Sequence, residues 1–218
     1  MNAADPATAG VRMSDELRSS PAPAAFAKNL YYDSTQKIDA AKLLPGEYFV
    51  CVRDMLLVTV LGSCVAACVR DVRTGMGGMN HFMLPDSDVG STAISGARYG
   101  AFAMDLLINH LLKLGARRDC LEAKVFGGGN VLASLTQSNV GHKNAAFVTA
   151  YLRAAHIPIA SADLADVCPR KVYFFPASGR VLVKRLTVLH NNTIFDRESG
   201  YRTRLTRTVP RGNAGEPK

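Results

Sequence analysis

The order of apolar and polar positions in the middle of the chain predicts two strands joined through a glycine-punctuated bend. Met55–Leu61 is a continuous apolar run with several β-branched residues, which is typical of a buried strand. The run stops at Gly62-Ser63, so Cys64 follows directly after the bend. Val65–Arg70 then resumes a strand-like pattern. The sequence therefore predicts a cysteine at the junction of two strands.

A polar turn, Asp71–Gly75, separates this second strand from another apolar stretch that contains His81. If the two stretches form an antiparallel hairpin with Cys64 opposite His81, the turn centres between Val72 and Arg73, inside the polar segment. Directly opposed side chains lie roughly 4.5–5.5 Å apart at Cβ, close enough for a thiol and an imidazole to share a proton. A bulge at one of the glycines near the turn would shift this pairing by one residue.

Periodicity elsewhere in the chain predicts two helices and further strands. Helical spacing of leucines runs through Ala97–Leu114 and stops at Gly115, and a second helix is expected within Asn139–His156. The remaining strands are expected at Glu47–Val52, Met76–Leu84, Cys120–Phe126, Ile157–Ala160, Lys171–Phe175 and Arg180–Leu186. Because strands both precede and follow the helices, we expect an α+β fold, a single layered domain with mixed β-sheets and two main helices packed on one side.

Composition and charge suggest one domain with two tails. The chain has 218 residues, of which 48% are hydrophobic, enough for one sizeable core. Residues 1–28 lack periodicity and are expected to be a disordered leader, residues 29–190 the domain, and residues 191–218 a basic flexible tail. From position 197 onward the chain has six basic and two acidic residues, half of the formal net charge of +8. Such a tail can attract an acidic partner, but we favour a solubilising role, and no specific nucleic-acid recognition is expected.

Other classes of protein are disfavoured by what the sequence lacks. There is no apolar run of the roughly 18 residues that a membrane span needs, and no secretory signal, so we expect a cytoplasmic protein without membrane insertion. The five cysteines are odd in number and scattered, which argues against a disulfide framework and against a zinc site. We expect no metal and no cofactor.

The predicted cysteine–histidine pair has two interpretations. An imidazole beside a thiol lowers the thiol pKa from about 8.5 and generates a nucleophilic thiolate. Alternatively, Cys64 is a small buried hydrophobe and His81 a strand histidine with satisfied hydrogen bonds. The residues alone leave both open. The glycine run Gly127–Gly129 lacks the spacing of a phosphate-binding loop and is expected to be a tight turn that borders the site.

Two segments carry a family resemblance, LGSCVAACVRD at 61–71 and GGMNHFMLPD at 77–86. They resemble the signature of CheD, the chemoreceptor glutamine deamidases of bacterial and archaeal chemotaxis. Further similar segments follow the family order and extend the resemblance over roughly residues 45–187: PGEYFV, ARYGAFAMDLLI, KVFGGGNVL, NAAFV and KVYFFPASGRVLVKRL. Gly141 and Asn144 also match a Gly-x-x-Asn pattern of the family.

The resemblance implies a deamidase with a fold like that of cysteine-hydrolase deamidases. Cys64 matches the nucleophile and His81 the general base, and Thr59 matches a threonine that supports the pair. Residues expected to border the substrate or the oxyanion are Gly62, Ser63, Val65, Asn80 and Gly128. The implied substrates are methyl-accepting chemotaxis receptors, with recruitment to receptor clusters at the inner membrane, and a CheC-type phosphatase is an implied partner. The alternative is a non-catalytic adaptor that docks on receptors or signalling proteins through the same surface.

Overall fold

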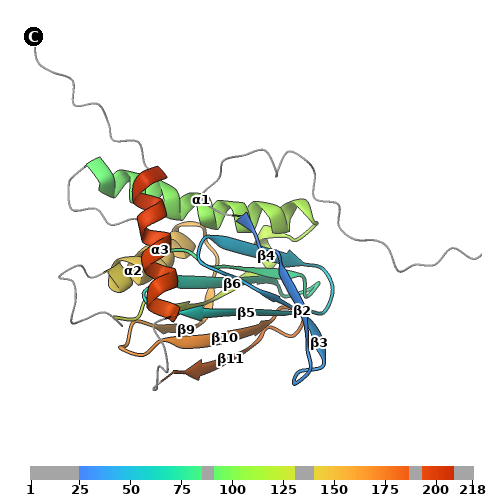
Figure 1. Cartoon of the computed structure of the whole chain (residues 1–218). Coiled ribbons are helices and arrows are strands. Elements are labelled where there is room, and N and C mark those ends of the chain that lie inside the picture. The colour runs from blue at the N-terminus through green and yellow to red at the C-terminus, as the bar shows by residue number, and fades with distance from the viewer. Residues whose placement is uncertain (1–24, 85–90, 131–139, 187–192, 209–218) are drawn as a thin grey trace, which may run out of the picture.

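The structure, a computed structural model, describes residues 25–84, 91–130, 140–186 and 193–208. It consists of three layers, two helices over a six-stranded sheet that packs on a five-stranded sheet (Figure 1). None of the described helices is long and apolar enough to cross a membrane.

Eleven strands and three α-helices make up the described part of the chain. The strands are β1 (Ala25–Phe26), β2 (Asn29–Asp33), β3 (Ile38–Lys42), β4 (Glu47–Cys51), β5 (Leu56–Leu61), β6 (Val65–Asp71), β7 (Gly77–Asn80), β8 (Leu121–Gly127), β9 (Ile159–Leu164), β10 (Arg170–Phe175) and β11 (Arg180–Arg185). The helices are α1 (Ser91–Lys113), α2 (Val140–Ala154) and α3 (Thr193–Thr208), with a 3₁₀ turn at Arg118–Cys120.

Both sheets are mixed. One has the order β1-β4-β7-β6-β8-β9 and the other β11-β10-β5-β3-β2. The pairs β1–β4, β8–β9 and β3–β5 are parallel, and the other neighbours are antiparallel. The expected α+β fold with mixed sheets and two main helices on one side is therefore confirmed.

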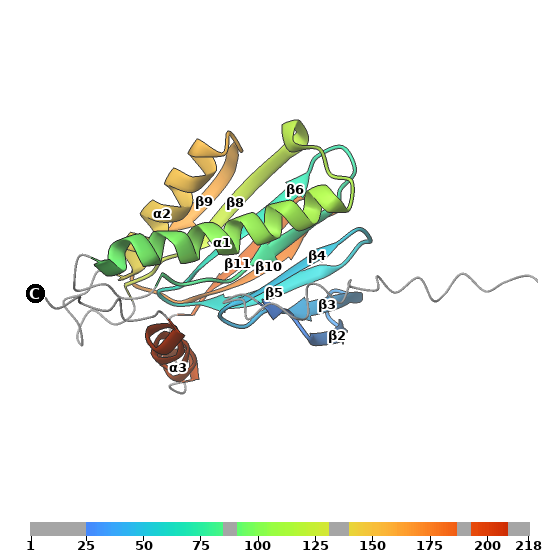
Figure 2. The ribbon, with the colours of Figure 1, turned by 90° about the horizontal axis from the view of Figure 1, so that it is seen from above.

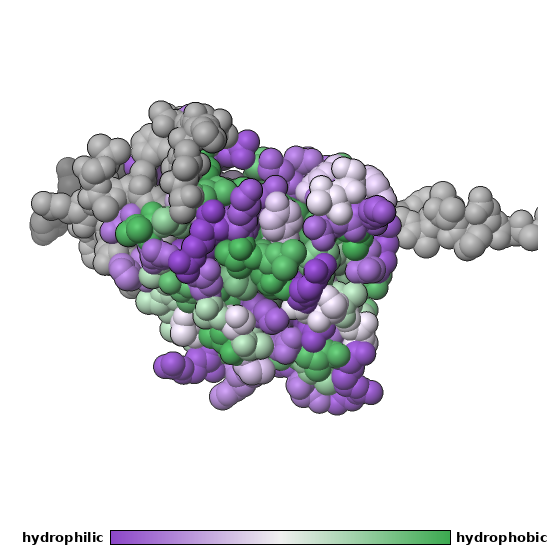
Figure 3. Space-filling view, turned by 90° about the horizontal axis from the view of Figure 1, so that it is seen from below, coloured by the Kyte–Doolittle hydropathy of each residue, from purple (hydrophilic) through white to green (hydrophobic). Residues whose placement is uncertain are grey.

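Alternation along β5 shows how the core is divided between the layers. Leu57 and Leu61 belong to the main core between the sheets, whereas Leu56 and Val58 face the outside of the five-stranded sheet and form a small second cluster with Phe175. Figure 3 shows this outer face, where apolar side chains are surrounded by hydrophilic ones. Because β5 is buried on both faces, its sequence reads as a continuous apolar run.

The two main helices cover the six-stranded sheet (Figure 2). Helix α1 packs on β4, β6 and β7, and α2 packs on β6, β8 and β9. Ala103, Leu107 and Leu111 are buried at a spacing of four residues, which forms the inward stripe of α1. Gly115, with φ +103°, ends the helix as expected. Helix α1 begins at Ser91, six residues before the start expected from the leucine spacing.

The predicted hairpin register is wrong by two residues. Val65, not Cys64, is the residue beside the bend that pairs, and its partner is Phe82. The turn centres one residue later than expected because the Asp71 carboxylate accepts hydrogen bonds from the following amides and Gly75 adopts φ +75°. A two-residue shift keeps side chains on their faces, so Cys64 and His81 remain on the same side as diagonal neighbours.

The C-terminal segment also differs from expectation. Residues 193–208, expected as extended tail, form α3. Residues 25–26, expected in the leader, form β1, and β2 and β3 were not predicted. Residues 1–24, 187–192 and 209–218 lie outside the described residues. The division into leader, domain and tail at positions 28 and 190 therefore stays a prediction.

Candidate active site

The structure brings together the three residues expected to act as nucleophile, base and support. Thr59 lies in β5, Cys64 follows the bend between β5 and β6, and His81 follows β7. β5 belongs to one sheet, and β6 and β7 belong to the other, so the three side chains meet between the layers. All three are buried, with exposed fractions of 0% for Thr59 and Cys64 and 1% for His81.

Thr59 fixes the tautomer of the His81 ring. Its hydroxyl donates to the carbonyl of Leu43 at 2.9 Å and lies 2.7 Å from His81 Nδ1. Since the only hydroxyl proton is used on Leu43, Thr59 accepts a hydrogen bond, and Nδ1 carries the ring proton. The other nitrogen, Nε2, therefore presents its lone pair, and it has no hydrogen-bond partner among the described residues. A buried imidazole with a free Nε2 lone pair is suited to act as a base.

Burial keeps both reactive groups neutral in this conformation. It lowers the pKa of His81 to about 4, opposed by the Glu198 carboxylate nearby. It also raises the pKa of the Cys64 thiol well above its usual range, and Glu198 raises that pKa further. A neutral imidazole can accept the thiol proton, but the thiolate that results is favoured only when water or a polar substrate reaches the site.

Three consecutive backbone amides form an anion-binding nest. The N–H groups of Gly62, Ser63 and Cys64 all donate to one carboxylate, that of Glu198, at 2.9, 2.9 and 3.2 Å. The Ser63 hydroxyl donates to the same group at 2.7 Å. Converging backbone donors of this kind stabilise the oxyanion that develops when a nucleophile attacks an amide.

Hydrogen bonds on the opposite side hold these peptide planes in place. The carbonyl of Gly62 accepts from the Gly129 amide at 2.8 Å, and the carbonyl of Cys64 accepts from the Gly128 amide at 2.7 Å. The carbonyl of Ser63 accepts from Asn144 Nδ2 at 2.8 Å, and Asn144 Oδ1 accepts from the Leu84 amide. Because the carbonyls of Gly62 and Ser63 are tied back, the amides of Ser63 and Cys64 in the same peptide planes point into the site before any ligand binds.

The glycine run forms the expected tight turn beside the site. Gly127 has φ +103°, and a Cβ there would lie 2.2 Å from the carbonyl oxygen of Cys64. Gly128 also has a positive φ, +65°. Only glycine fits this close approach to the cysteine loop.

Three of the residues expected to border the substrate or the oxyanion, Val65, Asn80 and Gly128, use their polar groups on structural partners. The amide of Gly128 is used on Cys64, and the amide of Val65 donates to the carbonyl of Phe82 at 2.9 Å. The Asn80 side chain accepts from the Ala67 amide and donates to α1, so it ties β6 to the helix rather than facing the thiol. That these residues border the substrate or the oxyanion stays a prediction.

Sequence reasoning missed Glu198, which comes from α3 and is only 4% exposed. Its carboxylate occupies the nest, and it lies 134 residues from Cys64 in the sequence. A sequence signal for this helix was present, because four residues have the spacing of one helical face: Ile194, Glu198, Tyr201 and Leu205. The charged residue Glu198 within this otherwise apolar or aromatic stripe obscured the helical pattern. Asn144 was noted only as a match to a family pattern, and the structure shows it beside the nest.

The site also contains a set of side chains that could ligate a metal. Cys64, His81 and Glu198 each offer a ligand atom, and these atoms lie within 4.8 Å of one another. Sulfur, nitrogen and oxygen donors suit zinc. However, both oxygens of Glu198 already accept hydrogen bonds from the nest, so this carboxylate is satisfied without an ion. The absence of a metal stays a prediction.

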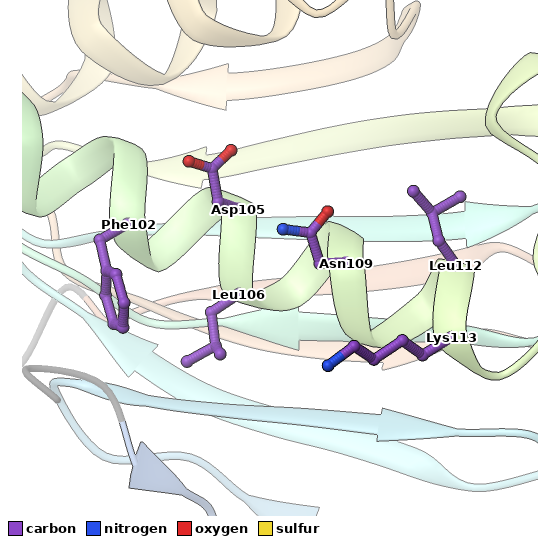
Figure 4. A pocket seen from close by; sticks show the side chains of 6 residues that line it. All are labelled: Phe102, Asp105, Leu106, Asn109, Leu112 and Lys113. Carbon is purple, nitrogen blue, oxygen red and sulfur yellow. The ribbon is translucent and has the colours of Figure 1, made fainter. Parts of the chain in front are cut away.

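A hollow on the surface of α1 is not part of this site. Figure 4 shows its lining, six side chains of α1 around a volume of about 590 Å³: Phe102, Asp105, Leu106, Asn109, Leu112 and Lys113. None of the three reactive residues borders it. The reactive centre is instead the sealed region at Cys64.

Known proteins are similar to this chain over most of their length. A protein of Dechloromonas aromatica named probable chemoreceptor glutamine deamidase CheD 1 is 59% identical over 181 residues, covering 83% of this chain and 90% of the relative. CheD proteins with the same probable activity in their names, from Janthinobacterium sp. and Thiobacillus denitrificans, are 60% and 58% identical over 182 and 189 residues. They cover 83% and 86% of this chain and 90% and 94% of the relatives. The chain belongs to the CheD family. The family described as CheD chemotactic sensory transduction also matches residues 83–185, and the expected resemblance to CheD is confirmed.

Proposed function

We propose that this CheD family member is a protein-glutamine deamidase that converts glutamine side chains of chemoreceptors to glutamate and releases ammonia. The observation that carries the proposal is the oriented His81, which has an unpartnered Nε2 among the described residues and a ring nitrogen within 4.8 Å of the Cys64 sulfur, next to a backbone nest. The names of the CheD relatives supply the substrate class, chemoreceptors.

The first half of the reaction makes a thioester. His81 Nε2 accepts the Cys64 proton, and the thiolate attacks the side-chain carboxamide carbon of a glutamine. The amide oxygen becomes an oxyanion, which the amides of Gly62, Ser63 and Cys64 stabilise at the place where the Glu198 carboxylate now lies. Each such donor typically lowers the barrier by roughly 2.7–4 kcal/mol.

The second half releases the product. The imidazolium gives its proton to the departing ammonia as the C–N bond breaks, which leaves a γ-glutamyl thioester on Cys64. Water, deprotonated by the same His81, then attacks the thioester carbonyl and frees glutamate and the thiol. Thr59 keeps the ring in one tautomer through both steps, because its hydroxyl holds the Nδ1 proton.

The proposal extends to location and to a second partner. An enzyme that modifies chemoreceptors works where they cluster, so we include recruitment to receptor clusters at the inner membrane. The family resemblance adds a CheC-type phosphatase as a partner. Co-purification of the two proteins in the presence and absence of a receptor fragment tests that interaction.

The deciding experiment compares wild-type protein, Cys64→Ala and Cys68→Ala on a purified receptor cytoplasmic fragment, with intact-mass and ammonia readouts. We expect a gain of about one dalton per modified glutamine with the wild type and with Cys68→Ala, which alters another buried cysteine. Cys64→Ala should abolish it. Equal modification by wild type and Cys64→Ala refutes the thioester mechanism, and receptor binding without modification supports the adaptor alternative.

A further inference from the structure

The proposed chemistry requires access that this conformation does not give. Cys64 is 0% exposed and His81 is 1% exposed, so a glutamine on another protein cannot reach the thiol. The group that fills the nest is a carboxylate of the same chain, Glu198. The element that covers the site is therefore α3.

Helix α3 contacts the domain through one face. Glu198, Tyr201 and Leu205 are buried at the spacing i, i+3 and i+7, which places them on the same side of the helix. The Tyr201 ring lies against Gly46, where an added Cβ would be 2.6 Å from it, and its hydroxyl is hydrogen-bonded to that of Tyr99. The rest of this helix is largely polar, and Figure 2 shows it apart from α1 and α2.

A small cavity remains where α3 meets the domain beside the base. It has a volume of about 20 Å³, roughly the space of one water, and is bordered by His81, Ile194 and Arg197 among others. The helix thus covers both the nucleophile loop and the imidazole.

Glu198 has the chemical structure that the proposed reaction would produce. A glutamate side chain on a helix is what remains after a helical glutamine has been deamidated. Here its carboxylate is held by three amides and the Ser63 hydroxyl, and a Cβ on Gly62 would collide with it at 2.9 Å. A side chain at position 62 would occupy the space that the Glu198 carboxylate fills.

We propose that the surface formed by Gly46, the 62–64 loop and Tyr99 is a helix-docking site, that α3 occupies it with Glu198 as an internal product mimic, and that a substrate helix must displace α3 to reach Cys64. The product-mimic part rests on the proposed function. The occupancy of the site by α3 rests only on the contacts described above.

A catalytic role for Glu198 fits the geometry less well. In its present position the carboxylate uses the amides that the oxyanion would need, and it raises the pKa of the thiol that must ionise. A residue that blocks the oxyanion donors and opposes thiolate formation inhibits the reaction. Removal of its side chain should therefore increase activity rather than abolish it.

Iodoacetamide alkylation of Cys64 tests the occupancy without requiring catalysis. The full-length variants are Glu198→Ala and Tyr201→Ala, and Asp196→Asn, an exposed acid of the same helix, is the matched control. We expect Cys64 to react at least about tenfold faster in the first two than in the wild type and the control, measured on its tryptic peptide. The partly exposed Cys120 and Cys168 serve as internal references. Equal Cys64 rates in all four proteins overturn the proposal.

Glu198→Gln tests the product mimic directly. In this variant the Cys64 thiolate would attack Cδ of the introduced glutamine, ammonia would leave with a proton from His81, and water would cleave the thioester to restore glutamate and thiol. We expect purified Glu198→Gln to gain about one dalton at position 198 over time, and the double variant with Cys64→Ala to retain glutamine. If the introduced glutamine persists in a preparation that deamidates a receptor fragment, the product-mimic proposal is overturned.

The two readouts separate this inference from the proposed function. Faster alkylation of Cys64 in Glu198→Ala, with no modification of receptor by any variant and no self-conversion of Glu198→Gln, retains the docking site and refutes the deamidase. Higher receptor deamidation by Glu198→Ala than by wild type supports both. Lost deamidation with unchanged alkylation makes Glu198 a catalytic residue and overturns the inference.

Discussion

In the proposed mechanism, Thr59 acts on the reaction only through His81. Its hydroxyl bridges the Leu43 carbonyl and His81 Nδ1, so the chain of hydrogen bonds runs from a backbone group to the base. Because Leu43 accepts the only hydroxyl proton, Thr59 can only accept a hydrogen bond from His81 Nδ1, and the ring is held in the tautomer with its proton on Nδ1. Thr59 is therefore a positioning residue, which makes a specific prediction.

Thr59→Val should lower kcat for receptor deamidation by about 10- to 100-fold, less than the roughly 10²–10⁴-fold contribution of the general base itself. Valine keeps the shape but releases Nδ1, so the ring can turn or change tautomer. Thr59→Ser, which keeps the hydroxyl, should retain most of the activity and the wild-type pH profile. If Thr59→Val stays active while Thr59→Ser loses activity, packing of the methyl group rather than the hydrogen bond is the role of Thr59.

The burial of His81 predicts how stability depends on pH. Burial lowers the pKa of His81 to about 4, whereas an unfolded histidine titrates near 6.5. Between these values the unfolded chain binds a proton that the folded chain does not, so the free energy of unfolding is at its full value above pH 6.5 and falls as the pH drops toward 4. The loss between pH 7 and pH 5 should be of order 2 kcal/mol.

Urea unfolding at several pH values measures this dependence. His81→Asn should flatten the curve between pH 7 and pH 5. His110, whose pKa burial also lowers, contributes in the same direction, so His110→Asn is the comparison that isolates His81. A slope unchanged in His81→Asn would show that the imidazole is protonated or exposed in the folded protein.

At the scale of elements, the active site depends on a contact between two loops. The bend at 62–64 presents the nest, and the glycine turn after β8 holds its carbonyls from behind. This contact leaves no room for side chains at positions 127–129. Close packing therefore explains the three adjacent glycines, and no phosphate-binding role is needed.

Gly127→Ala and Gly115→Ala separate crowding from backbone strain. Both glycines have φ +103°, but a Cβ at Gly127 meets the Cys64 carbonyl at 2.2 Å, and one at Gly115 has nothing within 4 Å. We expect Gly115→Ala to cost about 1–2 kcal/mol of stability with normal kcat, and Gly127→Ala to cost about 3 kcal/mol or more and to abolish activity. Urea unfolding and receptor deamidation measure the two effects. Similar losses in both variants would mean that the cysteine loop moves aside freely.

The sequence predicted most of the elements and the reactive pair, for reasons that are local. Apolar runs and glycine stops mark β5, β6, β8, β10 and β11 within a residue or two of their ends. Cys64 and His81 were paired correctly in space despite the shifted register, because a two-residue slip preserves the face of a strand. The order of strands in the sheets, including the parallel pair β3–β5, depends on contacts between distant segments, and no local pattern shows it.

Helix α3 was missed for a different reason. Its basic residues and low apolar content resemble a solvated tail, and its stripe includes a charged residue, Glu198. Only the nest gives that charge a reason to be buried, and the nest is a product of the folded domain. The local pattern of residues 193–208 therefore predicts a solvent-exposed segment, whereas the contact between Glu198 and the nest determines where the helix lies.

At the scale of the whole molecule, the reactive centre is assembled from both sheets and from the last described helix. Thr59 belongs to the five-stranded sheet, His81 to the end of a strand in the six-stranded sheet, and Glu198 to α3. The first two are held by extensive sheet and core packing. Glu198 is held by one face of a single helix, so we expect α3 to leave the domain far more readily than the sheets separate.

Helix α3 follows every described strand and both main helices in the sequence, and this order has a genetic consequence. Most premature stop codons inactivate an enzyme, yet a stop placed just ahead of residue 193 would spare every described strand, both main helices and the residues at 59, 64 and 81. Of the described residues it would delete only α3, the helix that carries Glu198. Such an allele should behave as a dominant gain of function, in which glutamine side chains of the receptors are converted to glutamate regardless of signal. A selection for constitutive receptor modification should therefore recover nonsense alleles.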